Sequence, residues 1–288
     1  MSKNKEELKY LKLLKKIIDE GTIEKTRNGD CYTIFGYEQR FLLKDGILPI
    51  FTTRNISIKI AFFELMFFIR GQTNIKYLHV NNIHIWDGNS TREYLDSRGL
   101  NDYPVGELGP IYGFQWRNFN YNIDKNNGID QLSNIIEELK NPEKRNSRRM
   151  VMTAWNPLLL DKMALPPCHV ICQFHVKDGK YLSCALFQRS MDAILGCPTN
   201  IICYSLLTHI LAKHCDLEVD EFIHFIGNVH IYKEHLEGVK TQIQRDPFKF
   251  PKIIIKNKKK NIEDYEFDDI YFVEPYNYHD KIKFKMIV

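Results

Sequence analysis

The sequence predicts an α+β fold, in which one domain is built on a mixed β-sheet covered by helices. Its 288 residues are 44% hydrophobic and 26% charged, which is ordinary for a globular protein and sufficient for a substantial core. Segments with helical periodicity are interspersed with strand-like runs, without the regular strand–helix–strand order of a parallel sheet. No linker, low-complexity tract or internal repeat interrupts the sequence. We therefore expect residues 1–288 to form a single domain.

The expected helices are recognised by the spacing of their apolar residues. Residues 4–20 place leucine and isoleucine on one face, and Gly21 ends the helix. Two other segments, 57–69 and 199–215, are apolar on almost every side, which is typical of helices buried in a core. Shorter helices are expected at 91–95, with Ser90 as the N-cap, and at 130–140.

The expected strands are short and rich in β-branched and aromatic residues. They cover 31–36, 39–43, 148–155, 169–176, 180–188, 222–232 and 252–255. Asp178-Gly179 separates two of them and favours a two-residue hairpin turn, because glycine tolerates the positive φ of such turns. In a hairpin closed by this turn Lys177 pairs with Lys180, and the same register places Cys168 opposite Arg189.

Cys168 is the first candidate for a chemical role. It stands in Pro166-Pro167-Cys168-His169, and the guanidinium expected opposite it would favour the thiolate and lower the pKa of the thiol below its usual value of about 8.5. The sequence therefore indicates an activated nucleophile. The alternative is a cysteine that merely begins a core strand. Zinc binding by Cys168, Cys172 and Cys184 is disfavoured, because no C-x-x-C or H-x-x-x-H spacing accompanies them.

Charged residues beside apolar segments supply further candidates. Glu64 lies in an almost entirely apolar helix, and a buried carboxylate must be paired, hydrogen-bonded, protonated or placed at a cavity. With its pKa raised by burial it would suit proton transfer near neutral pH; a structural ion pair is the alternative. Arg148 and Arg149 begin a predicted strand, and arginine forks suit phosphate or carboxylate groups. An ordinary surface position is the alternative for both.

Other features are weak signals when taken singly. His230 and Tyr232 share one face of a strand and could hold a sugar hydroxyl. Asn200 is either the N-cap of the helix that follows it or an amide that reads the edge of a nucleobase. Trp86 and Tyr112 lie in loops rich in Asn and Gly, where aromatic rings often stack on flat ligands.

Composition and motifs also disfavour several classes of protein. The net charge of +4 gives no strong electrostatic footprint for duplex DNA, so nucleic-acid binding is not expected. The sequence has no Gly-rich phosphate loop of the Walker or Rossmann type, no G-x-S-x-G motif and no helix-turn-helix pattern. Seven cysteines, the lack of a signal peptide and the lack of a long apolar run predict a cytoplasmic protein that does not enter a membrane.

Longer motifs resemble the thymidylate synthase family, in order, from Glu7 to Val288. They include Phe51-Thr52-Thr53-Arg54, Arg70-Gly71-Gln72-Thr73-Asn74, Ile85-Trp86-Asp87, Gly109-Pro110-Ile111-Tyr112-Gly113-Phe114-Gln115-Trp116-Arg117, Ser147-Arg148-Arg149, Ala164-Leu165-Pro166-Pro167-Cys168-His169 and Gln188-Arg189-Ser190. The resemblance implies a thymidylate synthase-like fold. It also implies reductive methylation of dUMP by 5,10-methylenetetrahydrofolate, which yields dTMP and dihydrofolate and needs no metal.

The resemblance implies catalytic roles for individual residues. Cys168 would add to C6 of the uracil ring, and Arg189 would both lower the pKa of the thiol and hold the phosphate. Glu64 would assist proton transfer through ordered water. Tyr112 would help to remove the proton from C5. The remaining catalytic candidates are Asp192 and His169.

The resemblance also implies two sets of binding residues. The dUMP site would comprise Arg27, Arg148, Arg149, Gln188, Arg189, Ser190, Met191, Asp192, Asn200, His230, Ile231 and Tyr232. Within it, Asn200 would select uracil over cytosine. The reduced folate would contact Trp86, Asn89, Asp192, Leu195, Gly196 and Ile287. Active sites of this family are shared across a homodimer with sheet packed on sheet, so Arg148 and Arg149 would reach the substrate of the other subunit.

Several positions depart from the usual pattern of the family. The loop that contains Arg27 is one residue shorter, Phe67 and Thr199 replace tryptophan and phenylalanine, and Ser57 and Ile58 stand where larger residues often cradle the folate tail. These changes predict weaker folate or antifolate binding, not a different reaction. Two alternatives remain open. One is a hydroxymethyltransferase that omits the reductive step, and the other is a homologue retained as a regulatory or nucleic-acid-binding protein.

Overall fold

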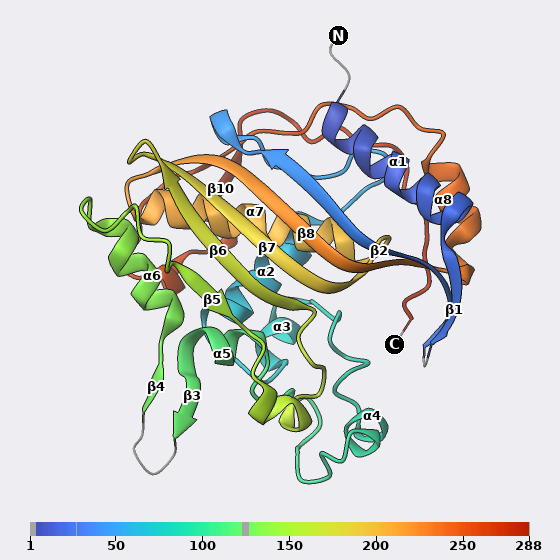
Figure 1. The fold of residues 1–288 in the computed structure, drawn as a ribbon, viewed down its shortest axis with the longest axis horizontal. Helices are drawn as coiled ribbons and strands as arrows, with labels where there is room; N and C mark the ends of the chain where they lie inside the picture. The colour runs from blue at the N-terminus through green and yellow to red at the C-terminus, as the bar shows by residue number, and fades with distance from the viewer. Residues whose placement is uncertain (1–3, 27, 123–126, 288) are drawn as a thin grey trace.

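The described part of the chain is built around a six-stranded mixed sheet (Figure 1). A computed structural model gives the positions of residues 4–26, 28–122 and 127–287. The sheet has the order β1-β2-β8-β7-β6-β5, in which β7 and β8 run parallel and the other neighbours antiparallel. Its strands are β1 (Thr22–Thr26), β2 (Gly29–Leu42), β5 (Val151–Thr153), β6 (His169–Lys177), β7 (Tyr181–Asp192) and β8 (Glu218–Tyr232). The expected α+β fold with a mixed sheet is confirmed.

Helices cover one face of this sheet. In Figure 1, α7 and α2 lie behind the strands, and α7 packs on β7 and β8. Almost every side chain of α2 and α7 is buried, as their continuous apolar sequences predict. The helices are α1 (Lys5–Glu20), α2 (Ile58–Ile69), α3 (Lys76–Val80), α4 (Arg92–Ser97), α5 (Tyr112–Asn118), α6 (Gln131–Lys140), α7 (Gly196–His214) and α8 (Leu236–Gln242).

Helix ends follow the capping chemistry of the sequence, with one correction. The side chain of Asn4 accepts the N–H of Glu7 at the start of α1, and Asp130 accepts the N–H of Ser133 at the start of α6. The helix α4 is capped by Thr91, not by Ser90 as the sequence predicted, because the Thr91 hydroxyl accepts the N–H of Tyr94.

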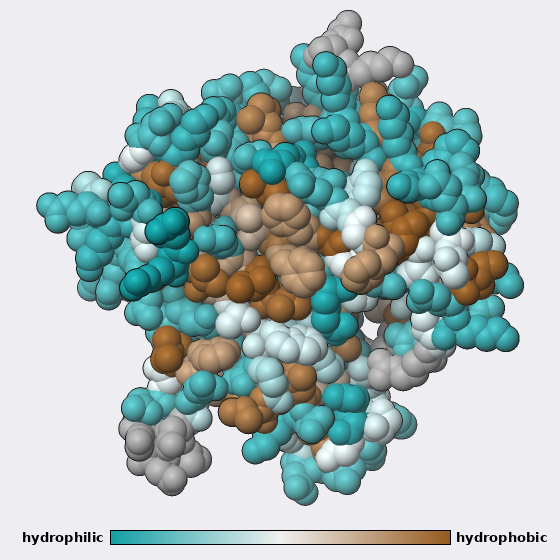
Figure 2. Space-filling view, viewed as in Figure 1, coloured by the Kyte–Doolittle hydropathy of each residue, from teal (hydrophilic) through white to brown (hydrophobic). Residues whose placement is uncertain are grey.

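The other face of the sheet is open and carries apolar side chains. Ile171, Phe187 and Phe225 face one another across β6, β7 and β8 and are about two-fifths exposed, and Phe35 on β2 is 87% exposed. Figure 2 shows brown apolar side chains gathered over the middle of this face. A patch of exposed apolar side chains on an open sheet is typical of a surface that another protein covers.

The hairpin β6–β7 reaches the expected pairing by an unexpected route. Lys177 pairs with Tyr181, not Lys180, so the turn is one residue longer than predicted, with positive φ at Asp178 and Gly179. An irregularity between His169 and Ile171 then restores the predicted register at the far end. The backbone N–H of Arg189 consequently donates to the carbonyl of Cys168 at 2.9 Å, so these two residues do lie opposite each other.

Several element boundaries differ from the expected ones. The segments 31–36 and 39–43 are one continuous strand, β2, and β5 covers only the middle of the expected strand 148–155. Helix α7 begins at Gly196, so Asn200 lies inside its first turns and Leu195 is its N-cap. The N-cap role considered for Asn200 is therefore wrong.

Small elements complete the chain around the sheet. Two-stranded ladders join β3 (Phe119–Asn122) to β4 (Asn127–Ile129) and β9 (Ile253–Ile255) to β10 (Ile270–Phe272). Short 3₁₀ turns lie at Lys44–Gly46, Pro157–Lys162, Lys233–His235, Ile262–Asp264 and Phe267–Asp269. Among the helices of the described ranges, none is both long and apolar enough to cross a bilayer.

Candidate active site

Two adjoining cavities lie where β7, β8 and the start of α7 meet. The inner cavity, of about 370 Å³, is lined by Ile60, Glu64, Phe68, Ile85, Trp86, Asn89, Tyr112, Leu165, Cys168, His169, Gln188, Ser190, Asp192, Leu195, Gly196, Thr199, Asn200 and Met286. The outer one, of about 300 Å³, is lined by Glu24, Thr26, Asn28, Cys31, Ser190, Asn228, His230 and Tyr232. Ser190 lines both, so the cavities are neighbours.

A larger cavity of about 600 Å³ lies elsewhere, among Lys44, Tyr181, His209 and Lys256. None of the residues to which the sequence assigns chemistry lines it. Cavity size alone therefore does not identify the site. The inner cavity is identified by the reactive and polar side chains that line it.

Cys168 is held at the wall of the inner cavity by Arg189. The guanidinium donates to the carbonyls of Pro166 at 2.8 Å and Pro167 at 2.9 Å, and its Nη2 lies 3.7 Å from the Cys168 sulfur. The two prolines therefore do more than precede the cysteine, because their carbonyls orient the cation that lies against the thiol.

The pKa of the Cys168 thiol corrects one expectation. Burial raises this pKa above its ordinary value, while the charge of Arg189 and the contact with Tyr112 act in the lowering direction. The predicted influence of Arg189 is thus present, but in the single chain it is outweighed by desolvation. Further positive charge near the sulfur would be needed for a large thiolate fraction at neutral pH.

Glu64 faces the inner cavity from α2 and is bonded to Trp86. The indole Nε1–H donates to Glu64 Oε1 at 3.0 Å, and both side chains are buried. Burial raises the pKa of Glu64 to about 7, and the hydrogen bond from Trp86 opposes this only in part. Glu64 is therefore a hydrogen-bonded carboxyl group at a cavity, poised to exchange a proton near neutral pH, as the sequence indicated.

Tyr112 touches the nucleophile segment directly. Its hydroxyl oxygen accepts the backbone N–H of Cys168 at 2.8 Å, and its ring stacks on Phe68 and meets Trp86 and His169 edge to face. Burial raises the pKa of Tyr112 well above its ordinary value. The group is therefore a neutral hydroxyl that can still donate its proton.

An amide network forms another wall of the inner cavity. Gln188 Nε2 donates to Asn200 Oδ1 at 3.1 Å, and Gln188 Oε1 lies 2.8 Å from His224 Nε2. Burial lowers the pKa of His224 to about 3 and that of His169 to about 4, so both imidazoles are neutral at physiological pH. Neutral His224 donates to Gln188, and this fixes the orientation of the Gln188 amide and, in turn, that of Asn200.

The outer cavity presents polar groups of β8. His230 Nδ1 lies 2.9 Å from Asn228 Oδ1, and the rings of His230 and Tyr232 meet at 5.2 Å. Asp192 pairs with His230 across the strands and accepts the N–H of Ile194 at 2.8 Å. Burial lowers the pKa of His230. Asn228, His230 and Tyr232 thus offer this cavity polar groups suited to hydroxyls, and Glu24 also lines it.

Comparison with known proteins decides the family. The model of the thymidylate synthase family matches residues 8–288. The chain belongs to the thymidylate synthase family. Thymidylate synthase of Saccharomyces cerevisiae is 46% identical to it over 99% of the chain and 98% of the relative, and that of Ascaris suum is 43% identical over 99% and 98%. The bifunctional dihydrofolate reductase-thymidylate synthase of Leishmania major is 43% identical, and the chain spans 56% of its length.

Membership in the thymidylate synthase family establishes the class of reaction. The chain is a folate-dependent methyltransferase that forms dTMP from dUMP. The one-carbon unit and the hydride come from 5,10-methylenetetrahydrofolate, and no metal takes part.

Most of the predicted site residues come together, and a few do not. Trp86, Asn89, Leu195 and Gly196 line the inner cavity, whereas Ile287 does not and its neighbour Met286 does. Met191 and Ile231 point into the core from the opposite faces of their strands, so only their backbone groups could meet a ligand. Arg27 lies outside the described residues.

Arg148 and Arg149 are exposed and line neither cavity of their own chain. They precede β5, so the alternation of a regular strand does not apply to them. The carbonyl of Arg148 accepts Gln173 Nε2 at 3.2 Å, which places the pair beside an outward-facing residue of β6. Within a single chain, both arginines therefore lie at the surface.

The departures from the family pattern fall at the edge of the site. Thr199 lines the inner cavity and, with Ser57, a neighbouring one of about 240 Å³ that Arg54 and Lys281 also border. Ile58 lines neither, and Phe67 is fully buried in the core. Ser57 and Thr199 are therefore the substitutions placed to affect a bound folate.

Two polar residues of the site gave little signal in the sequence. His224 is buried in the strand β8, and Asn228 lines the outer cavity. The only sign of His224 in the sequence was a histidine at a position of β8 where the alternation places side chains in the core. Cys172 and Cys184 are buried in the core and, within the described ranges, do not join Cys168 in a group able to hold an ion.

Proposed function

We propose that the chain performs thymidylate synthesis with Cys168 as the nucleophile. The observation that carries this is the Cys168 sulfur, 3.7 Å from Arg189 Nη2, in one cavity with Glu64, Tyr112 and Asn200. The thiolate adds to C6 of dUMP, which forms a C–S bond and moves the electrons of C5=C6 into an enolate. C5 bonds to the one-carbon unit, and loss of the C5 proton breaks the bond between that carbon and the folate nitrogen, which leaves a methylene group on C5. Hydride from the folate then reduces the methylene to methyl while the C–S bond breaks, leaving dihydrofolate.

The uracil ring is read by the amide of Asn200. Because Gln188 donates to Asn200 Oδ1, the NH₂ group of Asn200 is oriented away from Gln188 and can donate to the uracil O4. Cytosine presents an amino group at that position and would leave two donors face to face. A buried donor without an acceptor is costly, so this contact favours uracil.

Proton transfers fall to Glu64 and Tyr112. A carboxyl group with a pKa of about 7 can supply and remove protons at neutral pH, which suits stabilisation of the enolate at O4 and protonation of the folate nitrogen through water. The Tyr112 hydroxyl, fixed by the N–H of Cys168, would assist removal of the C5 proton. His169, kept neutral by burial, supports the Asn200 wall of the cavity.

The deoxyribose and phosphate would extend into the outer cavity. His230 and Tyr232 would hold the sugar hydroxyl, with Ser190 placed where the two cavities meet. Arg189 and Arg27 would bind the phosphate from the same subunit. The folate ring would lie in the inner cavity between Trp86, Asn89, Asp192, Leu195 and Gly196, with the segment that ends at Ile287 folded over it.

A homodimer completes the phosphate site in this proposal. The exposed row of Ile171, Phe187 and Phe225 supports an interface in which two sheets pack face to face. The phosphate would then meet Arg148 and Arg149 of the partner subunit. Two more guanidinium groups near the site would also add the positive charge that the Cys168 thiol lacks in a single chain.

The shared site has a sharp test. Subunits with Cys168→Ala and subunits with Arg148→Ala should each be inactive as homodimers, and mixed dimers should recover activity, because one of their two sites is intact. If mixing restores nothing, the partner subunit does not supply Arg148.

The reaction itself is tested by incubating the chain with dUMP and 5,10-methylenetetrahydrofolate and following the absorbance rise of dihydrofolate. We expect dTMP and dihydrofolate in equal amounts. Hydroxymethyl-dUMP without dihydrofolate would instead assign a hydroxymethyltransferase. No turnover, together with binding of nucleic acid, would support the regulatory alternative.

The chain is further proposed to be one catalytic domain of the cytoplasm. One continuous core, from Tyr10 to Tyr265, supports a single domain over residues 1–288. Seven free cysteines, all within the described residues, are typical of a reducing compartment. Limited proteolysis and cell fractionation test these two statements, and release of separately stable fragments or a membrane-bound pool would contradict them.

A further inference from the structure

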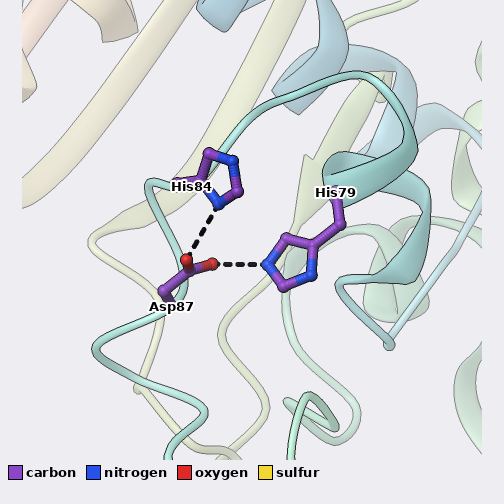
Figure 3. Close-up of side chains that lie close together, drawn as sticks. All are labelled: His79, His84 and Asp87. Carbon is purple, nitrogen blue, oxygen red and sulfur yellow. Dashed lines mark hydrogen bonds and ion pairs between the residues drawn. The ribbon is translucent and has the colours of Figure 1, made fainter.

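We propose that His79, His84 and Asp87 bind a divalent transition-metal ion of the zinc type at the protein surface, beside the turn that carries Trp86. Figure 3 shows the two imidazoles converging on the carboxylate. His79 Nε2 lies 2.7 Å from Asp87 Oδ1, and His84 Nδ1 lies 3.0 Å from Asp87 Oδ2. Each residue offers one ligand atom, and these three atoms lie within 4.8 Å of one another. Within the described ranges, no other group of three or more His, Cys, Asp or Glu side chains meets this condition.

The backbone, and not chance overlap of long side chains, brings these residues together. Helix α3 ends at Val80, and Asn82 has a left-handed conformation with φ of 59°. The N–H groups of Asn82 and Ile83 donate back to the carbonyls of His79 and Leu78 at 2.9 Å each. The chain therefore reverses at Asn82, so that a residue of the last turn of α3 faces residues four and more positions beyond the helix end.

Asn82 also orients one of the proposed ligands. Its Oδ1 lies 3.2 Å from His84 Nε2, and an amide oxygen is an acceptor. In the tautomer that donates the Nε2–H of His84 to Asn82, the Nδ1 lone pair points at the carboxylate of Asp87. Two electron-rich atoms 3.0 Å apart attract a positive charge between them, which a proton or a metal ion supplies.

The donor set selects the class of ion. Two imidazole nitrogens and one carboxylate oxygen suit zinc and its first-row neighbours better than magnesium or calcium, which prefer oxygen ligands. Three protein ligands leave a position for water, as in open zinc sites. The His84 and Asp87 side chains are 57% and 44% exposed, so an ion can reach them from solvent. This ion is separate from thymidylate synthesis, which needs none.

Binding here would restrain part of the folate-binding wall. Asp87 directly follows Trp86, whose indole bonds to Glu64, and the N–H of Asn89 donates to the Trp86 carbonyl at 3.2 Å. An ion held by His79, His84 and Asp87 would tie the end of α3 to this turn. We expect amide hydrogen exchange between residues 79 and 90 to slow when the ion binds.

The test uses the full chain, freed of metal by a chelator and titrated with Co²⁺, whose visible absorption reports its ligands. We expect one Co²⁺ per chain with a nitrogen–oxygen spectrum, displaced by Zn²⁺. His79→Gln and His84→Gln should each abolish it, whereas His279→Gln, which removes a surface imidazole bonded to the Asp246 carbonyl, should leave it unchanged.

A milder variant tests the contact between Asn82 and His84. Asn82→Gly keeps the left-handed backbone accessible and removes only the amide, so the affinity for Co²⁺ should fall by about 10- to 100-fold. Equal turnover of the chelated native, His79→Gln and His84→Gln proteins shows that the variants fold. The proposal is overturned if the native protein binds no Co²⁺, if binding survives in the histidine variants, or if a sulfur–cobalt charge-transfer band places the ion at the cysteines.

Discussion

Replacing Glu64 by glutamine should stabilise the protein at alkaline pH while it removes activity. The glutamine keeps the shape of the side chain, and its Oε1 can still accept the indole N–H of Trp86. What the substitution removes is the cost of ionising a buried carboxyl group. The carboxyl group of Glu64 thus serves the reaction, whereas its ionisation destabilises the folded protein.

The magnitude follows from the pKa of about 7 in the folded protein and the value of 4.5 for an unperturbed glutamate. Because the folded state favours the protonated form of Glu64, the free energy of unfolding falls as pH rises above 4.5. It levels off above about pH 7. The advantage of Glu64→Gln should therefore grow from about 1 kcal/mol near pH ~5 to about 3 kcal/mol near pH ~8.

Urea denaturation measures this difference at the two pH values, at one fixed protein concentration because the proposed dimer would unfold in a concentration-dependent way. Glu137→Gln, on the exposed side of α6, is the matched control and should show no comparable growth. In parallel, kcat of Glu64→Gln should fall by about 10²- to 10⁴-fold. A stability difference that stays constant from acid to alkaline pH would refute the claim that Glu64 is a buried acid with a raised pKa.

Three further substitutions test other parts of the account. Arg189→Lys loses the fork that bonds the proline carbonyls, so alkylation of Cys168 by iodoacetamide should slow at neutral pH; an unchanged rate would show that Arg189 does not activate the thiol. Phe225→Asp places a charge on the open sheet face, so sedimentation should show monomers with folded circular dichroism; a retained dimer would place the interface elsewhere. Asn200→Asp offers an acceptor in place of the donor, so the preference for dUMP over dCMP should fall by at least about tenfold, and a preserved preference would assign the reading of uracil to another group.

The sequence was sufficient for the fold class, and most of the residues it singled out lie together around one cavity. The apolar segments at 57–69 and 199–215 are buried helices because a helix without a polar face has no stable position at a surface. Glu64 could be singled out because a carboxylate among phenylalanines must have a compensating partner. Cys168 and Arg189 do lie opposite each other, but the register predicted from the turn holds only at that end of the hairpin, because the longer turn and the irregularity near His169 offset each other.

What the sequence could not give depends on three-dimensional detail. The longer turn at Asp178-Gly179 and the irregularity near His169 are two register errors that cancel, and neither leaves a mark in the local residue pattern. The net direction of the Cys168 pKa depends on the balance of burial against one guanidinium, which spacing does not reveal. Asp87 appeared only as the neighbour of Trp86, since the helix end that brings His79 to it was not predicted.

The analogue 5-fluoro-dUMP tests directly whether Cys168 attacks C6 of the pyrimidine. Fluorine at C5 cannot leave as a proton does, so the reaction should stop after the C–S bond and the bond to the folate carbon have formed. Mass spectrometry of the protein incubated with 5-fluoro-dUMP and 5,10-methylenetetrahydrofolate should find the adduct of both ligands on the peptide that contains Cys168. The absence of an adduct, or an adduct on another of the seven cysteines, would contradict the account.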